Sequence, residues 1–197
     1  MLLSLDAVQA AFTKKSYTVK TRPYELNVFG VRSSQGATNS FDDVIGALYF
    51  DYGRNPSLQW WAATTDPGLF YLEHPLNVDG TAILVPRQHT ESHRIGLHKG
   101  QYRALVQNKP LPVYRDSNKD DVYDFLVPSI QTGVFGINIH HAGDHSTVVD
   151  KWSAGCQVFA EIEKFDVLMS LVDMHVGEGY GDVFTYTLFN EKDLVGG

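Results

Sequence analysis

Residues 136–157 begin Gly136-Ile-Asn-Ile-His-His-Ala-Gly143 and end Ser153-Ala-Gly-Cys-Gln157. This stretch contains the only cysteine, Cys156, and three of the eight histidines, which are His140, His141 and His145. A cysteine and a histidine that meet in space can form an activated nucleophile, because the imidazole accepts the thiol proton. The apolar run 133–140 indicates an extended segment that ends at the histidines, and a loop follows it up to the cysteine.

Length and charge limit the classes of protein to consider. The 197 residues fit a single domain, 1–197, with a core of its own. A formal charge of −7 without a long run of either sign argues against a nucleic-acid partner, because such proteins present a basic face. One cysteine cannot form an intramolecular disulfide. The sequence leaves the oligomeric state open.

The start of the chain and its hydropathy bear on localisation. Met1-Leu-Leu-Ser-Leu-Asp6 lacks the basic region of a signal peptide. No apolar run approaches the roughly 20 residues of a membrane span, so we expect no membrane insertion. We therefore expect synthesis in the cytoplasm without a signal peptide.

Hydrophobic periodicity predicts a mainly β (α+β) fold, a sandwich or barrel with a few short helices. Residues 1–20 form an N-terminal helical segment, with a helix over 4–14 and Ser4 as its N-cap. A second helix is expected between Phe165 and Gly177. The expected strands are 24–28, 44–50, 58–65, 68–71, 81–85, 102–106, 111–114 and 182–189.

Two polar segments are expected to be loops. Residues 87–100 contain His89, His93 and His98, with Gly96 and Gly100 as breakers, so we expect loop histidines there, and a place in the lining of the cleft is the alternative. Asp116–Asp124 resembles the start of a calcium loop, but it lacks the glycine at position six and the glutamate at position twelve. A solvated turn explains this second segment better than a cation site.

Gly155-Cys156 offers what acyl transfer needs. The thiolate can attack a carbonyl, a histidine can handle the proton, and main-chain N–H groups of Gly155 and Cys156 can stabilise the oxyanion. Gly155-Cys156 precedes a helix in the expected order of elements, and a helix that starts after the cysteine would lower the pKa of the thiol through its dipole.

Residues 133–189 contain the pattern Ile139-His140 followed by Ser153-x-Gly155-Cys156, with His140 preceding Cys156 by 16 residues. This pattern resembles the signature of the L,D-transpeptidase catalytic domain, a family of cysteine enzymes that act on peptidoglycan. The resemblance implies an L,D-transpeptidase-like β-sandwich or barrel. It covers the catalytic motif region, 133–189, and nothing comparable occurs in the first two thirds of the chain.

The resemblance also implies roles for single residues. Cys156 would be the nucleophile and His140 the general base, while Ser153 and Gly155 would support the turn. His141, Trp152 and Gln157 are the candidate substrate contacts. No cofactor and no metal are implied.

Three positions depart from the family pattern. Ala154 stands where histidine or lysine is usual, His141 replaces a glycine, and Val158 stands where an arginine would help to hold the substrate. A zinc site made from His145, a neighbouring histidine and Cys156 is an alternative, because those ligand types suit zinc. An inert core thiol is another alternative.

Taken together, the sequence favours a peptidoglycan-cleaving cysteine peptidase of the endolysin type, which would act on the cell wall after release. Its partner would be bacterial peptidoglycan, with a thioester acyl-enzyme resolved by water. The alternatives are an L,D-transpeptidase that forms cross-links with the same residues, and a non-catalytic wall-binding or virion protein of the same fold. A cytoplasmic amidotransferase-like enzyme is more distant.

Overall fold

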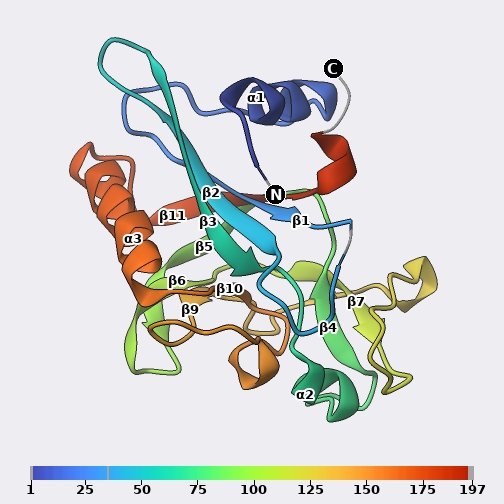
Figure 1. Ribbon diagram of the computed structural model, residues 1–197. Helices are drawn as coiled ribbons and strands as arrows, with labels where there is room; N and C mark the ends of the chain where they lie inside the picture. Colours follow the sequence, from blue (N-terminus) through green and yellow to red (C-terminus); the bar gives the residue numbers. More distant parts are fainter. Residues whose placement is uncertain (1, 35, 195–197) are drawn as a thin grey trace.

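The computed structural model describes residues 2–34 and 36–194 and shows a mainly β, α+β protein built around a closed barrel (Figure 1). In order around the barrel, the strands are β1 (Asn27–Arg32), β11 (Val183–Asn190), β5 (Gln88–His98), β6 (Tyr102–Gln107), β9 (Ile139–His141), β10 (Gln157–Phe159), β3 (Pro56–Thr64) and β2 (Asp43–Phe50). The pairs β1–β11 and β9–β10 are parallel, and the other barrel pairs are antiparallel.

A second sheet lies beside one end of the barrel. Its order is β4 (Thr81–Leu84), β7 (Leu111–Asp116) and β8 (Gln131–Gly133), all antiparallel. The helices are α1 (Leu5–Lys14), α2 (Leu69–Glu73) and α3 (Ile162–Gly177), and short 3-10 turns cover Val127–Ser129, Asp150–Trp152 and Glu191–Asp193. Within the described residues, no helix has both the length and the apolar character needed to span a membrane.

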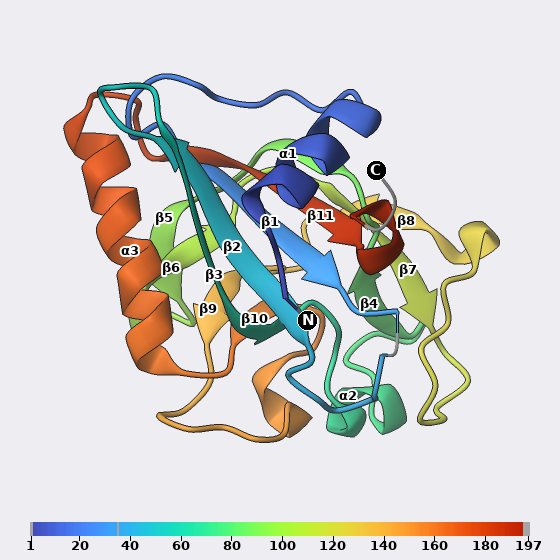
Figure 2. The ribbon, with the colours of Figure 1, turned by 45° about the horizontal axis from the view of Figure 1, so that its top comes forward.

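Two hydrophobic cores follow from the alternation of side chains along the strands. In β11, Phe184, Tyr186 and Leu188 join the larger core, which fills the barrel and continues beneath α3 and the second sheet. Phe189 points the other way and packs with Phe12 of α1, with ring centroids 5.0 Å apart. Figure 2 shows α1 lying over β1 and β2, with α3 along the side of the barrel.

The local expectations for both long helices are confirmed. Ser4 caps α1, because its Oγ accepts a hydrogen bond from the N–H of Ala7 at 3.2 Å. In α3 the buried positions recur at helical spacing and include Phe165, Leu168 and Val172. The expected strands over 44–50, 58–65, 81–85, 102–106, 111–114 and 182–189 are also present, with ends shifted by a few residues.

Other expectations about local structure are wrong. Residues 68–71 belong to α2 and its N-cap, and the strand expected over 24–28 begins only at Asn27. Residues 87–100 are mostly strand, because β5 runs without a break from Gln88 to His98. The three histidines of β5 are buried, and each has a hydrogen-bonding contact, so polar side chains occupy interior positions on this strand.

The Asp116–Asp124 segment is a turn held by its own side chains. The Asn118 amide donates to Asp120 Oδ2 at 2.8 Å and to Asp124 Oδ2 at 3.0 Å, and the Asp124 N–H donates to Asp116 Oδ2 at 2.9 Å. These hydrogen bonds close the turn, whereas Oδ1 of the buried Asp116 has no hydrogen-bond partner among the described residues.

Candidate active site

The parallel pairing of β9 with β10 brings the two halves of the 136–157 motif together. Val158 lies opposite His140 in the register, and the N–H of Gln157 donates to the carbonyl of Asn138 at 2.8 Å. Two parallel neighbours need a connection that crosses over, which the loop 142–156 supplies. Cys156, immediately before β10, therefore lies beside the segment that contains His140.

A tight turn before Cys156 fixes the position of the thiol. The Ser153 hydroxyl donates to the carbonyl of Cys156 at 2.8 Å and accepts from the N–H of Gly155 at 3.1 Å. Gly155 has φ +119°, and a Cβ there would lie 2.4 Å from the carbonyl oxygen of Ala82. Only glycine fits this backbone, so Ser153 and Gly155 hold the turn.

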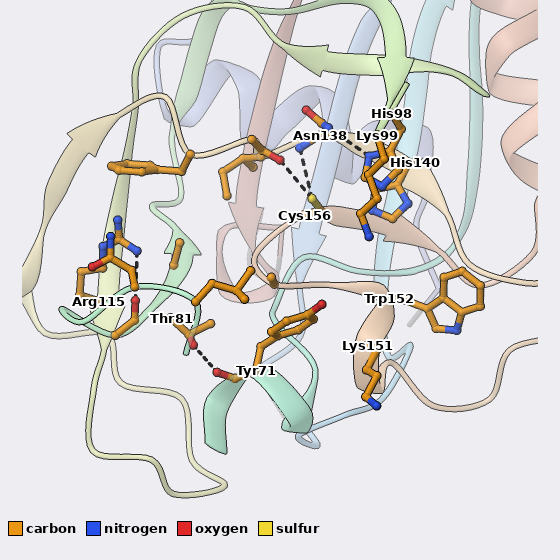
Figure 3. Close-up of a pocket in the computed structure, with 18 residues that line it drawn as sticks. Tyr71, Thr81, His98, Lys99, Arg115, Asn138, His140, Lys151, Trp152 and Cys156 are labelled. Carbon is orange, nitrogen blue, oxygen red and sulfur yellow. Dashed lines mark hydrogen bonds between the residues drawn. The ribbon is translucent and has the colours of Figure 1, made fainter. Parts of the chain in front are cut away.

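Cys156 opens onto a cavity of about 460 Å³ between the barrel and the second sheet (Figure 3). The lining includes His98, Asn138, His140 and Trp152. Figure 3 shows both imidazoles on one side of the thiol. A concave site with a nucleophile and titratable side chains is where chemistry is expected.

The thiol of Cys156 contacts main-chain groups on both sides. Its Sγ donates to the carbonyl of Gly136 at 3.3 Å and accepts from the N–H of Asn138 at 3.5 Å. Burial raises the pKa of Cys156, and the Asn138 N–H and Lys99 only partly offset this. The helix expected after the cysteine is α3, but β10 separates its start at Ile162 from Cys156, so its N-terminus does not adjoin the sulfur.

His140 is a neutral imidazole with a free base nitrogen. Its Nδ1 lies 2.9 Å from the carbonyl of His141, which can only accept, so Nδ1 bears the proton. The hydroxyl of Tyr102 lies 3.2 Å from the same nitrogen. Nε2 is buried and has no hydrogen-bond partner among the described residues, Cys156 included. Burial and the neighbouring His98 lower the pKa of His140 to about 3.

The structure adds His98 to the site. It stands at the end of β5, and the side-chain amide of Asn138 lies 3.0 Å from its Nδ1. The polar composition of 87–100 favoured a loop for this histidine, and its place in the cavity lining agrees with the alternative instead. No local periodicity marks it, because His98 lies five residues after His93 and so faces the other side of the strand.

Two of the candidate substrate contacts lie outside the cavity lining. The His141 ring packs against Tyr102 and Phe165, with centroids 4.3 and 5.3 Å apart. Gln157 is fully buried in the barrel, where its Nε2 donates to the carbonyl of Thr65 at 3.2 Å. The Gln157 side chain is enclosed in the barrel and cannot contact a substrate. Of the three candidate substrate contacts, only Trp152 lines the cavity.

The expected oxyanion donors differ in availability. The N–H of Gly155 is already bonded to Ser153 Oγ. The N–H of Cys156 has no acceptor within residues 2–34 and 36–194, so it is the main-chain donor available to a developing oxyanion.

The zinc alternative finds no support in the arrangement of ligands. Across the described ranges, no three His, Cys, Asp or Glu side chains are grouped closely enough to hold a metal ion. His145 is exposed on the loop 142–156.

Protein-family models, curated proteins and solved structures were each compared with this chain, and none of them matches it.

Proposed function

We propose that the protein is a cysteine peptidase that cleaves peptidoglycan stem peptides through a thioester on Cys156. The observation that supports this most is that the Cys156 thiol and the neutral imidazole of His140 line the same cavity. Nε2 of His140 has no hydrogen-bond partner among the described residues, so it can accept a proton. The peptidoglycan substrate class follows from the resemblance of the 136–157 motif to the L,D-transpeptidase signature.

The proposed reaction begins with a proton transfer that accompanies attack. As Sγ bonds to the substrate carbonyl carbon, the thiol proton passes to Nε2 of His140, and the carbonyl of His141 holds Nδ1–H in place. The substrate oxygen becomes an oxyanion that accepts from the N–H of Cys156. Proton transfer that accompanies attack suits a resting site in which the Cys156 thiol and the His140 imidazole are both neutral.

The tetrahedral intermediate then collapses to a thioester. The C–N bond breaks, and the departing amine takes the proton from Nε2 of His140. A water molecule next attacks the thioester and gives its proton to the same nitrogen. Release of the carboxylic acid returns the thiol of Cys156 and a neutral imidazole.

The test uses purified sacculi incubated with the natural protein and with Cys156→Ala, followed by mass spectrometry of the muropeptides. Shortened or uncrosslinked peptides that require Cys156 support the peptidase. New cross-links would instead identify a transpeptidase that resolves the same thioester with an amine. An unchanged profile with retained wall binding would contradict both enzymes and indicate a non-catalytic wall-binding protein. Circular dichroism checks that Cys156→Ala is folded.

A second set of variants tests the base. His140→Gln should abolish the Cys156-dependent products, and His141→Ala should leave them. Loss of activity in His141→Ala with retention in His140→Gln would show that the base is misassigned. Activity that disappears with a metal chelator would overturn the metal-free mechanism.

A further inference from the structure

The cavity at Cys156 is positively charged although the protein is acidic. Its charged lining residues are Lys99, Arg115 and Lys151, and no aspartate or glutamate lines it. The chain as a whole has a formal charge of −7. None of these cations forms a salt bridge with any described residue. Cations gathered without counter-charges in a concave site attract an anionic ligand.

Arg115 is the most buried of the three cations, and hydrogen bonds hold its side chain in place. The residue is only 7% exposed, and no carboxylate of the described residues forms a salt bridge with it. Nε donates to Gln131 Oε1 at 2.9 Å, Nη1 donates to the carbonyl of Gly80 at 3.0 Å, and the guanidinium lies 4.5 Å from the centroid of the Phe135 ring. Asp79 attracts the guanidinium, but its carboxylate accepts from Gln131 Nε2 at 2.9 Å.

This arrangement leaves part of the guanidinium for a ligand. Nη2 of Arg115 has no hydrogen-bond partner among the described residues. A buried charge is costly unless it is paired, so a buried, oriented arginine without an acid gains most from an anion that arrives with the substrate. Guanidinium geometry matches a carboxylate.

The three cations flank the nucleophile. Figure 3 shows Arg115 on one side of Cys156, and Lys151 with Trp152 on the other. Lys99 lies beside the two imidazoles. A peptide that places its scissile carbonyl at the sulfur would therefore extend toward Arg115 in one direction.

We propose that the cavity binds a carboxylate of the peptide substrate some way from the scissile bond, and that Arg115 anchors it. That the bound peptide is a substrate rests on the proposed function, whereas the anion site itself rests on the charges that line the cavity. Arg115 is then a specificity-determining residue, which selects acidic peptides over neutral ones.

The test compares three synthetic tetrapeptides for binding to Cys156→Ala by isothermal titration calorimetry. One has a D-glutamate side-chain carboxylate and an amidated C-terminus, one has glutamine and a free C-terminal carboxylate, and one has neither carboxylate. At least one acidic peptide should bind roughly ten- to a hundredfold more tightly than the neutral peptide, as expected for a charge-assisted hydrogen bond. Equal affinities, or no binding of any peptide, would overturn the inference.

Variants then assign the preference to Arg115. In Cys156→Ala/Arg115→Gln the acidic peptide should lose its advantage while the neutral peptide binds as before. The matched control is Cys156→Ala/Arg94→Gln, which removes an exposed arginine of β5 outside the cavity and should keep the preference. A preference that survives Arg115→Gln would show that another cation is responsible. Because Arg115 also bonds to Gly80 and Gln131, thermal unfolding and Arg115→Lys accompany the experiment.

The outcomes of this test and of the sacculus assay are separable. Sacculi cut by a protein without a carboxylate preference would remove the inference and leave the peptidase. Arg115-dependent binding of an acidic peptide by a protein that leaves sacculi intact would remove the peptidase and leave the anion site.

Discussion

The imidazole rings of His98 and His140 stack with their centroids 3.9 Å apart and their planes 23° apart. Asn138 joins this pair to the nucleophile, because its side chain contacts His98 and its main-chain N–H donates to Cys156 Sγ. Two histidines 42 positions apart in the sequence thus meet at one thiol. The stack keeps the His140 ring in one orientation and, by charge repulsion, opposes its protonation.

The first prediction separates the two histidines. His140→Gln should lower kcat by about 10²- to 10⁴-fold, the usual contribution of a general base. His98→Phe keeps a ring stacked on His140 and should lower kcat by less than about tenfold. Steady-state kinetics on a peptide cleaved by the natural protein measures both. The reverse order of effects would make His98 the base.

The second prediction concerns the reactivity of the thiol. Because burial raises the pKa of Cys156, alkylation by iodoacetamide at pH 7 should be slower in the folded protein than in the urea-unfolded chain. The rate should keep rising with pH beyond 9, and Lys99→Gln should slow it further, because the Lys99 cation favours the thiolate. Fast alkylation that is independent of pH above 6 would indicate a resting thiolate–imidazolium pair.

The third prediction compares two glycines. Gly155→Ala should destabilise the fold by about 3 kcal/mol or more, because its φ of +119° disfavours a side chain and the new Cβ would meet the carbonyl of Ala82. Gly177→Ala, at the exposed end of α3 with no atom within 4 Å of the added Cβ, should stabilise by about 0.5–1 kcal/mol. Urea unfolding measures both, and equal effects would contradict the strained turn.

The fourth prediction concerns acid stability. Burial lowers the pKa of His93 to about 3 in the folded protein, below the ordinary 6.5. The unfolded chain therefore binds the proton first, so the free energy of unfolding should fall as pH decreases from about 6.5 toward 3. Asp43 acts in the opposite direction: burial raises its pKa to about 7, which lowers stability as pH rises from about 4 to 7.

A proton count isolates the contribution of His93. At pH 5, the number of protons taken up on unfolding should be about one lower in His93→Gln than in the natural protein. The slope of unfolding free energy against pH gives this number even if the variant is less stable overall. An unchanged slope would show that His93 is protonated in the folded state.

Local pattern was enough to predict several elements. Ser4 followed by apolar residues at helical spacing predicted α1, and the spacing of Phe165, Leu168 and Val172 predicted α3. Alternating or continuous apolar runs predicted β2, β3, β6 and β11 of the barrel and β4 and β7 of the second sheet. These predictions hold because burying one face of a helix or strand leaves a period in the sequence.

The same reasoning failed where polar side chains occupy the interior. His93 is fully buried and contacts the carbonyl of Ile137 through Nε2 at 3.1 Å, and Gln157 accepts from the Tyr186 hydroxyl at 2.9 Å inside the barrel. A hydropathy pattern treats both as surface residues. Their partners come from distant parts of the chain, so their satisfaction is invisible to a local window.

The sequence by itself determined the mainly β class, the two long helices, and the candidate nucleophile and base, because Cys156 and His140 lie in one short motif. Only the tertiary structure decided which groups surround them. Parallel pairing of β9 with β10 places His140 near the cysteine, the end of β5 adds His98, and the second sheet contributes Arg115. Barrel closure brings these segments together, and the resulting burial raises the pKa of the thiol and lowers the pKa of the imidazole.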